Sequence, residues 1–210
     1  MKRNTKNKKA FQKILSTFIT LIAAVVLPIF TLSVQAESAG AGKTVETTVN
    51  QVKSTVTELS GKLGPKELDE KLKTIITPVF DFEEMSRRCL GVNWNNATKE
   101  EQKEFTSLFA ELLARSYLKQ IRDNAKDSEF TLASAREEGR RAIVQTLVKT
   151  PKETIKLDYR LYQKGGNWKV YDVIIENIGL VSNYRSEFGG IITKEGIKGL
   201  IQQLRTKVEG

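Results

Sequence analysis

The sequence predicts an α+β protein in which helices precede and follow an antiparallel sheet. Apolar residues recur three or four positions apart before residue 130 and after residue 180, which is the period of a helix. Between these regions polar and apolar residues alternate, and turn residues such as Glu138-Gly139, Pro151 and Gly165-Gly166 interrupt the alternation. We therefore expect four consecutive antiparallel strands, at about 130–137, 140–149, 154–163 and 168–177.

Caps and glycines mark the helix boundaries. Asp81 and Thr98 each precede a glutamate at the third following position, which is the pattern of a capping box. Gly189-Gly190 is expected to divide the last helical region, with Thr193 as the cap of the final helix. The expected helices cover about 45–59, 65–77, 82–90, 99–121, 181–188 and 194–204.

The first 36 residues have the layout of a secretory signal peptide. A segment with six cations and no acid is followed by the apolar residues 14–30, and Val34 and Ala36 occupy the small-residue positions of a cleavage site. An uncleaved anchor is the alternative, because seventeen apolar residues are near the short limit of a membrane span. Pro28 breaks the apolar segment and favours cleavage. We expect export to the periplasm with cleavage after Ala36.

Cleavage would change the charge balance of the chain. The whole sequence has 34 Lys and Arg against 25 Asp and Glu, but residues 1–36 hold six of the cations and none of the acids. The basic character therefore reflects mostly the signal peptide, and we expect no nucleic-acid partner. Residues 37–42 are expected to form a flexible leader, and 43–210 a single domain.

The composition excludes several kinds of chemistry. The chain has no histidine and one cysteine, so it lacks the residues for histidine-activated nucleophiles and for imidazole or thiolate metal sites. We expect no metal and no cofactor. Cys89 shares a helical face with Phe82 and Met85, which predicts a buried thiol, and a single cysteine forms no internal disulfide.

Residues 157–180 form a hairpin with an unusual number of large apolar side chains. Pairing across Gly165-Gly166 places Leu161 opposite Val170, Tyr159 opposite Asp172 and Leu157 opposite Ile174. Three roles for Asp172 stay open. It is a structural carboxylate, a polar contact at the mouth of a cleft, or a catalytic base with Tyr159 as hydrogen-bond donor in an isomerase-like site.

Four segments together resemble the MlaC, or toluene-tolerance, family. They are "VFDFEEMSRRCLGVNW" (79–94), "TKEEQKEFTSLFAELL" (98–113), "GNWKVYDVIIENIGLVSNYRSEF" (166–188) and "TKEGIKGLIQQL" (193–204). The resemblance covers about residues 43–206. It implies a curved antiparallel sheet of four or slightly more strands, wrapped by about five to six helices as in the nuclear-transport-factor cone.

The resemblance also implies a function without enzymatic chemistry. Members of the family hold phospholipid acyl chains between sheet and helices. They carry lipid between an outer-membrane lipoprotein complex and an inner-membrane ABC transporter with a mammalian-cell-entry ring, and we expect a monomer with these partners. The stretch "DFEEMSRRCLG" is similar to a branch with hopanoid-associated relatives, so a hopanoid or another lipid is an alternative ligand.

A lipid carrier must keep two acyl chains away from water. A diacyl phospholipid has roughly 30 methylenes, and burial favours each of them by about 0.8 kcal/mol. Apolar side chains on one sheet face, opposite the long helix, are candidates for this lining, although any one of them could instead pack the core. The candidates are Val144, Leu157, Tyr159, Leu161, Val173 and Ile174 from the sheet, and Phe105, Phe109, Leu112, Tyr117, Val181 and Tyr184 from helices.

Overall fold

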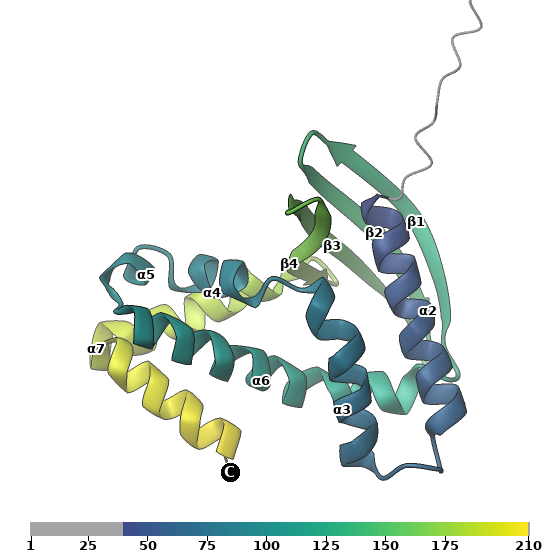
Figure 1. Ribbon diagram of the computed structural model, residues 1–210, viewed down its shortest axis with the longest axis horizontal. Coiled ribbons are helices and arrows are strands. Elements are labelled where there is room, and N and C mark those ends of the chain that lie inside the picture. The colour runs from purple at the N-terminus through teal and green to yellow at the C-terminus, as the bar shows by residue number, and fades with distance from the viewer. Residues whose placement is uncertain (1–39, 210) are drawn as a thin grey trace, which may run out of the picture. The chain divides into compact units, whose positions relative to one another are not determined.

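The computed structural model describes residues 40–209, and the expected signal peptide lies outside this range. Helices come first, a sheet follows, and one long helical segment ends the chain (Figure 1). The helices are α2 (Ala41–Leu59), α3 (Pro65–Ile76), the 3-10 turn η1 (Thr77–Val79), α4 (Phe82–Leu90), α5 (Asn93–Asn96), α6 (Lys99–Asn124) and α7 (Leu180–Glu209). The strands are β1 (Glu129–Glu138), β2 (Arg141–Lys149), β3 (Thr154–Lys164), β4 (Asn167–Ile175) and β5 (Ile178–Gly179).

The sheet is antiparallel throughout, in the order β1-β2-β3-β4-β5. The predicted four-stranded meander is thus confirmed, with the short strand β5 added at the edge. Register shifts between Leu132 and Ser134 and between Arg160 and Leu161 mark two bulges. Each bulge changes which residues of a strand face the helices, because successive side chains of a strand point to opposite faces.

Different helices pack on different strands of the sheet. α2 packs on β1 and β2, α4 and α7 pack on β4, and α6 packs against α3, α4 and α7. Figure 1 shows α2 lying along the curved strand β1, while α6 and α7 run side by side away from the sheet. β3 therefore lies between the strands that α2 covers and the strand that α4 and α7 cover.

Helix α2 begins at Ala41 and therefore includes the last two residues of the expected flexible leader. A Cβ added to Gly42 would lie 3.0 Å from the Cβ of Ala135, so the helix approaches β1 closely. The amide of Ala41 donates to the carboxylate of Glu137 at 2.8 Å, which caps a helix whose own N-cap residue, Gly40, offers no side chain. Packing on the sheet thus turns residues 41–42, expected as leader, into helix.

The two predicted capping boxes have different outcomes. Thr98 accepts from the amide of Glu101, and Glu101 accepts from the amide of Thr98, so the box that opens α6 is complete. Asp81 accepts from the amide of Glu84 at 3.0 Å. The Glu84 carboxylate, however, pairs with Arg87 and Arg88 instead of returning to the N-cap, so this cap is only half a box.

The predicted break at Gly189-Gly190 is wrong. Both glycines lie within α7, and the Thr193 hydroxyl donates to the Gly189 carbonyl at 2.8 Å, so Thr193 lies inside the helix and does not cap one. The helix instead breaks at Gly196, where φ is 71° and ψ is −180°. Only glycine adopts this conformation without strain.

Replacing Gly196 by alanine is therefore expected to destabilise the protein, by about 1–3 kcal/mol. Gly190 is the matched control, because it lies in regular helix with nothing within 4 Å of an added Cβ. Gly190→Ala should leave stability unchanged or raise it by about 0.5–1 kcal/mol. Urea denaturation of both variants measures the two effects. Equal stability of the two would show that Gly196 does not need its glycine backbone.

The buried apolar residues form two separate clusters. The larger one joins the sheet to α4, α6, α7 and the first half of α2. The smaller one joins the second half of α2 to α3 and the later part of α6, through Val52, Val56, Leu68, Leu72 and Leu118. Helices α2 and α6 therefore each contribute to both clusters.

Candidate functional site

The inner face of the sheet, which α2 covers, carries most of the predicted sheet residues. Cross-strand partners share a face of a sheet, so the register assigns side chains to rows. One row contains Ala135, Val144, Tyr159 and Val173. The next is apolar except for one threonine and crosses all five strands, and we call it the five-strand row: Leu132, Thr146, Leu157, Ile175 and Ile178.

Exposure along this face rises from one end of the sheet to the other. Near the Gly165-Gly166 turn, Leu161 is 0% exposed and Val170 is 1% exposed. Tyr159 and Leu157, the next inner-face residues along β3, are half-buried. The residues near the Gly165-Gly166 turn are thus fully buried, and in the five-strand row exposure is greatest at the two sheet edges, Leu132 (38%) and Ile178 (62%), with Thr146 at 0% between them.

Tyr159 lies deep in this face but is not fully packed. Burial raises the pKa of Tyr159 to about 12, and a hydrogen bond with the side chain of Thr146 opposes this shift. Thr146 in turn donates to the carbonyl of Leu157 at 3.2 Å. Tyr159 packs against the larger cluster and remains half-buried.

The predicted helix residues mostly lie in a packed aromatic cluster. Phe109 stacks on Phe105 with ring centroids 5.7 Å apart, and it meets Tyr184 edge-on at 5.2 Å and Phe188 at 5.6 Å. Phe105 and Phe109 are both 0% exposed. Rings in this arrangement fill the core. Tyr117 is only partly buried, and burial and the neighbouring Tyr184 raise its pKa.

The structure thus separates the twelve predicted lining residues into groups. Ten belong to the larger cluster or pack against it: Phe105, Phe109, Leu112, Tyr117, Val144, Tyr159, Leu161, Val173, Val181 and Tyr184. Leu157 lies on the inner face beside Thr146. Ile174 shares a row with Asp158 and lies on the outer face. Four members of the five-strand row are not among the predicted residues: Leu132, Thr146, Ile175 and Ile178.

A bulge explains the misplacement of Ile174. The pairing of Leu161 with Val170 is confirmed, but Arg160 pairs with Asp172, so Tyr171 is an extra residue on β4. Beyond Tyr171 the predicted register is wrong by one residue. A two-residue turn sets the register only up to the first bulge.

The same bulge separates the proposed catalytic pair. Tyr159 pairs with Val173 on the inner face, whereas Asp172 lies with Arg160 on the outer face. The prediction that Tyr159 and Asp172 form one site is therefore wrong. Asp172 has a structural role: it accepts from the amide of Val181 at 3.1 Å, at the start of α7, and it lies 3.5 Å from Arg160. Desolvation raises the pKa of Asp172 although these hydrogen bonds favour its ionised form.

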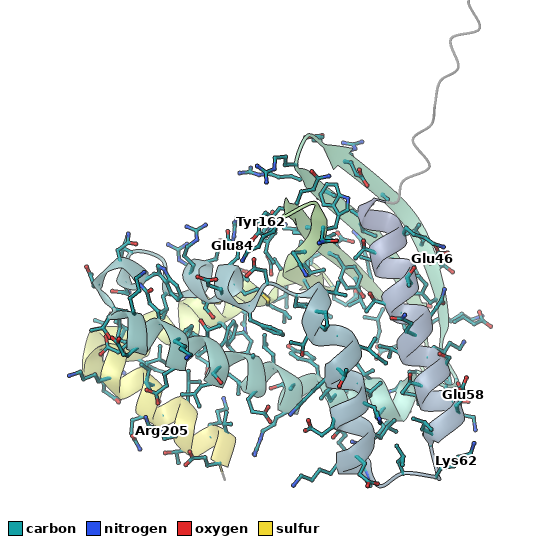
Figure 2. The ribbon with its side chains drawn as sticks, in the orientation of Figure 1. Glu46, Glu58, Lys62, Glu84, Tyr162 and Arg205 are labelled. Carbon is teal, nitrogen blue, oxygen red and sulfur yellow. The ribbon has the colours of Figure 1, made fainter. Side chains whose placement is uncertain are left out.

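A second buried carboxylate, Asp81, fixes α4 to the sheet. It accepts from Lys164 at 2.7 Å and from the hydroxyl of Tyr162, and its own amide donates to the Val170 carbonyl at 2.8 Å. Desolvation and the bond to Asp81 raise the pKa of Tyr162 to about 12. Figure 2 shows Tyr162 close to Glu84 at this junction. The sequence predicts Asp81 only as a helix cap, and its contacts with β3 depend on tertiary structure.

Cys89 is buried, as predicted. It is 2% exposed, and burial, together with the nearby Asp172, raises the pKa of its thiol to about 12. Within residues 40–209 the structure brings together no group of acids and cysteine that could hold a metal ion. In the same range, every helix is too short or too polar to cross a membrane. A surface hollow of about 310 Å³ lies apart from the inner face, between the ends of α2, α3 and α6.

A sequence profile of the family described as MlaC protein matches residues 46–206. The chain belongs to the MlaC family. The MlaC member from Haemophilus influenzae, an intermembrane phospholipid transport system binding protein, is 22% identical over 150 residues, 69% of this chain and 70% of that protein. The toluene tolerance protein ttg2D of Pseudomonas putida is 26% identical over 156 residues, 69% of this chain and 73% of that protein.

A solved structure supports the MlaC fold. The phospholipid-binding protein from Ralstonia solanacearum, determined in complex with a phospholipid, matches with a TM-score of 0.74 and 28% identity. The match covers 81% of this chain and 98% of that one. The α+β fold with an open antiparallel sheet is therefore shared with a protein that holds a lipid.

Proposed function

We propose that this chain is a carrier that holds phospholipid acyl chains between the inner face of its sheet and its helices. The observation that carries the proposal is the inner face itself. Its five-strand row is apolar except for Thr146, and the half-buried Tyr159 and Leu157 lie beside the fully buried Leu161 on β3. Membership in the MlaC family and the likeness to a structure with bound phospholipid support it.

The chemistry of the face suits tails and not head groups. The polar side chains in these two rows of β2 and β3 are Tyr159 and Thr146, and the Thr146 hydroxyl donates to the Leu157 carbonyl at 3.2 Å. We expect acyl chains to meet a surface that is mostly apolar and has few polar atoms to pair. Roughly 30 methylenes at about 0.8 kcal/mol each supply the binding energy, and weak anchoring of the head group keeps release possible.

The wider setting of the proposal is transport across the periplasm. The amino-terminal segment has the layout of a signal peptide, and the Haemophilus influenzae relative is part of an intermembrane transport system. We propose that the mature chain is a monomer that exchanges lipid with an outer-membrane lipoprotein complex and an inner-membrane ABC transporter with a mammalian-cell-entry ring. The carrier does no covalent chemistry in this scheme. The role of Asp172 is structural, because it accepts the Val181 amide at the start of α7.

Organic extraction of the purified mature protein, followed by mass spectrometry, tests the proposal. We expect about one diacyl phospholipid per chain. A hopanoid or another lipid in its place would keep the carrier function and change the ligand class. Protein that is free of lipid in every preparation, and takes none up from vesicles, would overturn the proposal.

A further inference from the structure

The outer face of the sheet has an exposed isoleucine with arginines on both sides. Ile143 is 45% exposed, and the register places it between Arg136 on β1 and Arg160 on β3. Arg141 is the next outer-face residue of β2, and Arg140 lies in the turn that joins β1 to β2. All five residues are exposed, because α2, the helix that packs on β1 and β2, covers the inner face. We call this group the arginine patch: Arg136, Arg140, Arg141, Ile143 and Arg160.

Three arginines of the patch lack the acidic partners that most other arginines have. Within residues 40–209, Arg136, Arg140 and Arg141 form no ion pair, although Glu138 lies opposite Arg141 in the register. Arg140 donates instead to the Gln163 carbonyl at 3.0 Å. The patch therefore keeps charges that the fold itself does not pair. In the same range, these arginines pair with a carboxylate of a helix: Arg87, Arg88, Arg115, Arg122 and Arg205.

The acids beside the patch do not cancel its charge. Asp172 lies 3.5 Å from Arg160, but it is buried and also accepts from the Val181 amide. Asp158 is half-buried and accepts from Gln145 at 3.3 Å. Arg160 stays exposed next to both of them. The charge that this end of the outer face presents to solvent is therefore mainly positive, around an apolar centre.

An apolar centre among cations suits a protein surface that carries carboxylates. An arginine guanidinium binds a carboxylate through two parallel hydrogen bonds, and arginine is enriched in protein interfaces. A typical interface has an apolar core with a polar rim, which is the layout of Ile143 and its arginines. A flat bilayer fits less well, because on the outer face it would lie on the side of the sheet opposite the proposed lipid site.

We propose that the arginine patch docks an acidic surface of a protein partner with which the carrier exchanges phospholipid. The proposal rests on the proposed function and deepens it, because it names the surface and the chemistry of the partner. Docking through the outer face leaves the inner face free for acyl chains to enter or leave. Exposed charges of opposite sign also speed association, which suits a carrier that meets its partners briefly and repeatedly.

Binding of the lipid-loaded mature protein to its proposed partners tests the docking surface. The probes are the outer-membrane lipoprotein complex and the ABC transporter with its mammalian-cell-entry ring, each purified in detergent and immobilised for biolayer interferometry. We expect the wild type to bind one or both, and the double variant Arg136→Glu, Arg141→Glu to associate about tenfold more slowly at low salt. The difference should shrink at high salt, because salt screens exposed charges.

Lys194→Glu, Lys198→Glu is the matched control for charge. Both lysines are exposed on α7, neither forms an ion pair within residues 40–209, and the change in net charge is the same. Figure 1 shows α7 running away from the sheet, so this variant should associate at the wild-type rate. Substitutions at exposed positions change stability little, and circular dichroism should show that both double variants are folded.

Ile143→Ala tests the apolar centre separately from the charges. We expect the complex of this variant to dissociate about fivefold faster, as is typical of a central interface residue. Leu147→Ala is the control, because Leu147 is also exposed on the outer face of β2 but lies two rows from Ile143. It should keep the wild-type dissociation rate.

A wild-type association rate for the Arg136, Arg141 double variant, or equal slowing by the Lys194, Lys198 variant, would overturn the proposal. A wild-type protein that binds neither complex would overturn it as well. Vesicles of phosphatidylglycerol without protein are the third probe, and binding that depends on the patch there, but with neither complex, would assign the patch to a bilayer instead. Lipid extraction from the purified protein does not depend on docking, so failure of the carrier function and failure of the docking surface are distinguishable.

Discussion

Replacement of Leu157 by aspartate is expected to empty the protein of phospholipid and leave it folded. Leu157 lies in the centre of the five-strand row, on the inner face of the middle strand β3, and it is only half-buried. A carboxylate there would lie among acyl chains, where an unpaired charge costs several kcal/mol. The short side chain of aspartate cannot extend to water as a lysine could. Mass spectrometry of lipid extracted from the purified variant measures the loss.

Leu147→Asp is the control for this experiment. Leu147 is the same residue type on the adjacent strand, 39% exposed on the outer face, and it pairs with Lys156. Both variants lose the same strand propensity, by less than about 1 kcal/mol. We expect Leu147→Asp to retain phospholipid. If Leu157→Asp retains as much, acyl chains do not lie against β3, and the site is elsewhere.

Phe109→Ala is expected to have the largest effect on stability. The residue is 0% exposed, and its ring contacts Phe105, Tyr184 and Phe188. Removing a ring from a packed cluster leaves a cavity, and such changes lower the free energy of unfolding by about 3–5 kcal/mol. Urea denaturation, monitored by circular dichroism, measures this change.

Tyr117→Ala is the comparison that separates core from lining on the same helix. Tyr117 lies two turns further along α6 and is only partly buried, so its loss should cost clearly less stability than the loss of Phe109. If the two variants lose equal stability, Tyr117 belongs to the packed core. A small change for Phe109→Ala would instead show that its cluster encloses empty or ligand-filled space.

The sequence predicts the elements of this fold well because each has a local signal. The period of apolar residues identifies the helices and strands, and the glycine pair at 165–166 identifies the β3–β4 turn. The break at Gly196 is less visible, because Gly189-Gly190 is the stronger glycine signal and lies in regular helix. Tertiary packing, such as that of α7 against α6, is not visible in the local sequence, and propensity alone is a weak guide to where a helix breaks.

The site is harder to predict than the fold, and one residue shows why. Tyr171 adds a bulge to β4, and from that point the alternation assigns every side chain to the wrong face. The alternation therefore predicts Ile174 on the lining and Asp172 beside Tyr159, which the structure contradicts. The aromatic residues of α6 raise a different difficulty, because a filled core and a lined chamber need the same apolar pattern. Phe109 and Tyr117 both fit the apolar pattern of α6. Their burial differs because the tertiary structure gives them different neighbours.

The contact between the start of α2 and the tip of β1 has a consequence for the order of folding. Nine of the nineteen residues of α2 are Thr or Val, so the helix is weak in isolation. Two hydrogen bonds with residues far along the chain stabilise it. The Ala41 amide donates to the carboxylate of Glu137, 96 residues later, and the Lys53 ammonium donates to the Ser128 carbonyl. We therefore expect helix α2 to become stable only after the sheet, in the middle of the chain, has formed. An α2 segment that stays unstructured until the sheet has formed would suit the export that the amino-terminal sequence predicts, because a translocation channel passes unfolded chain.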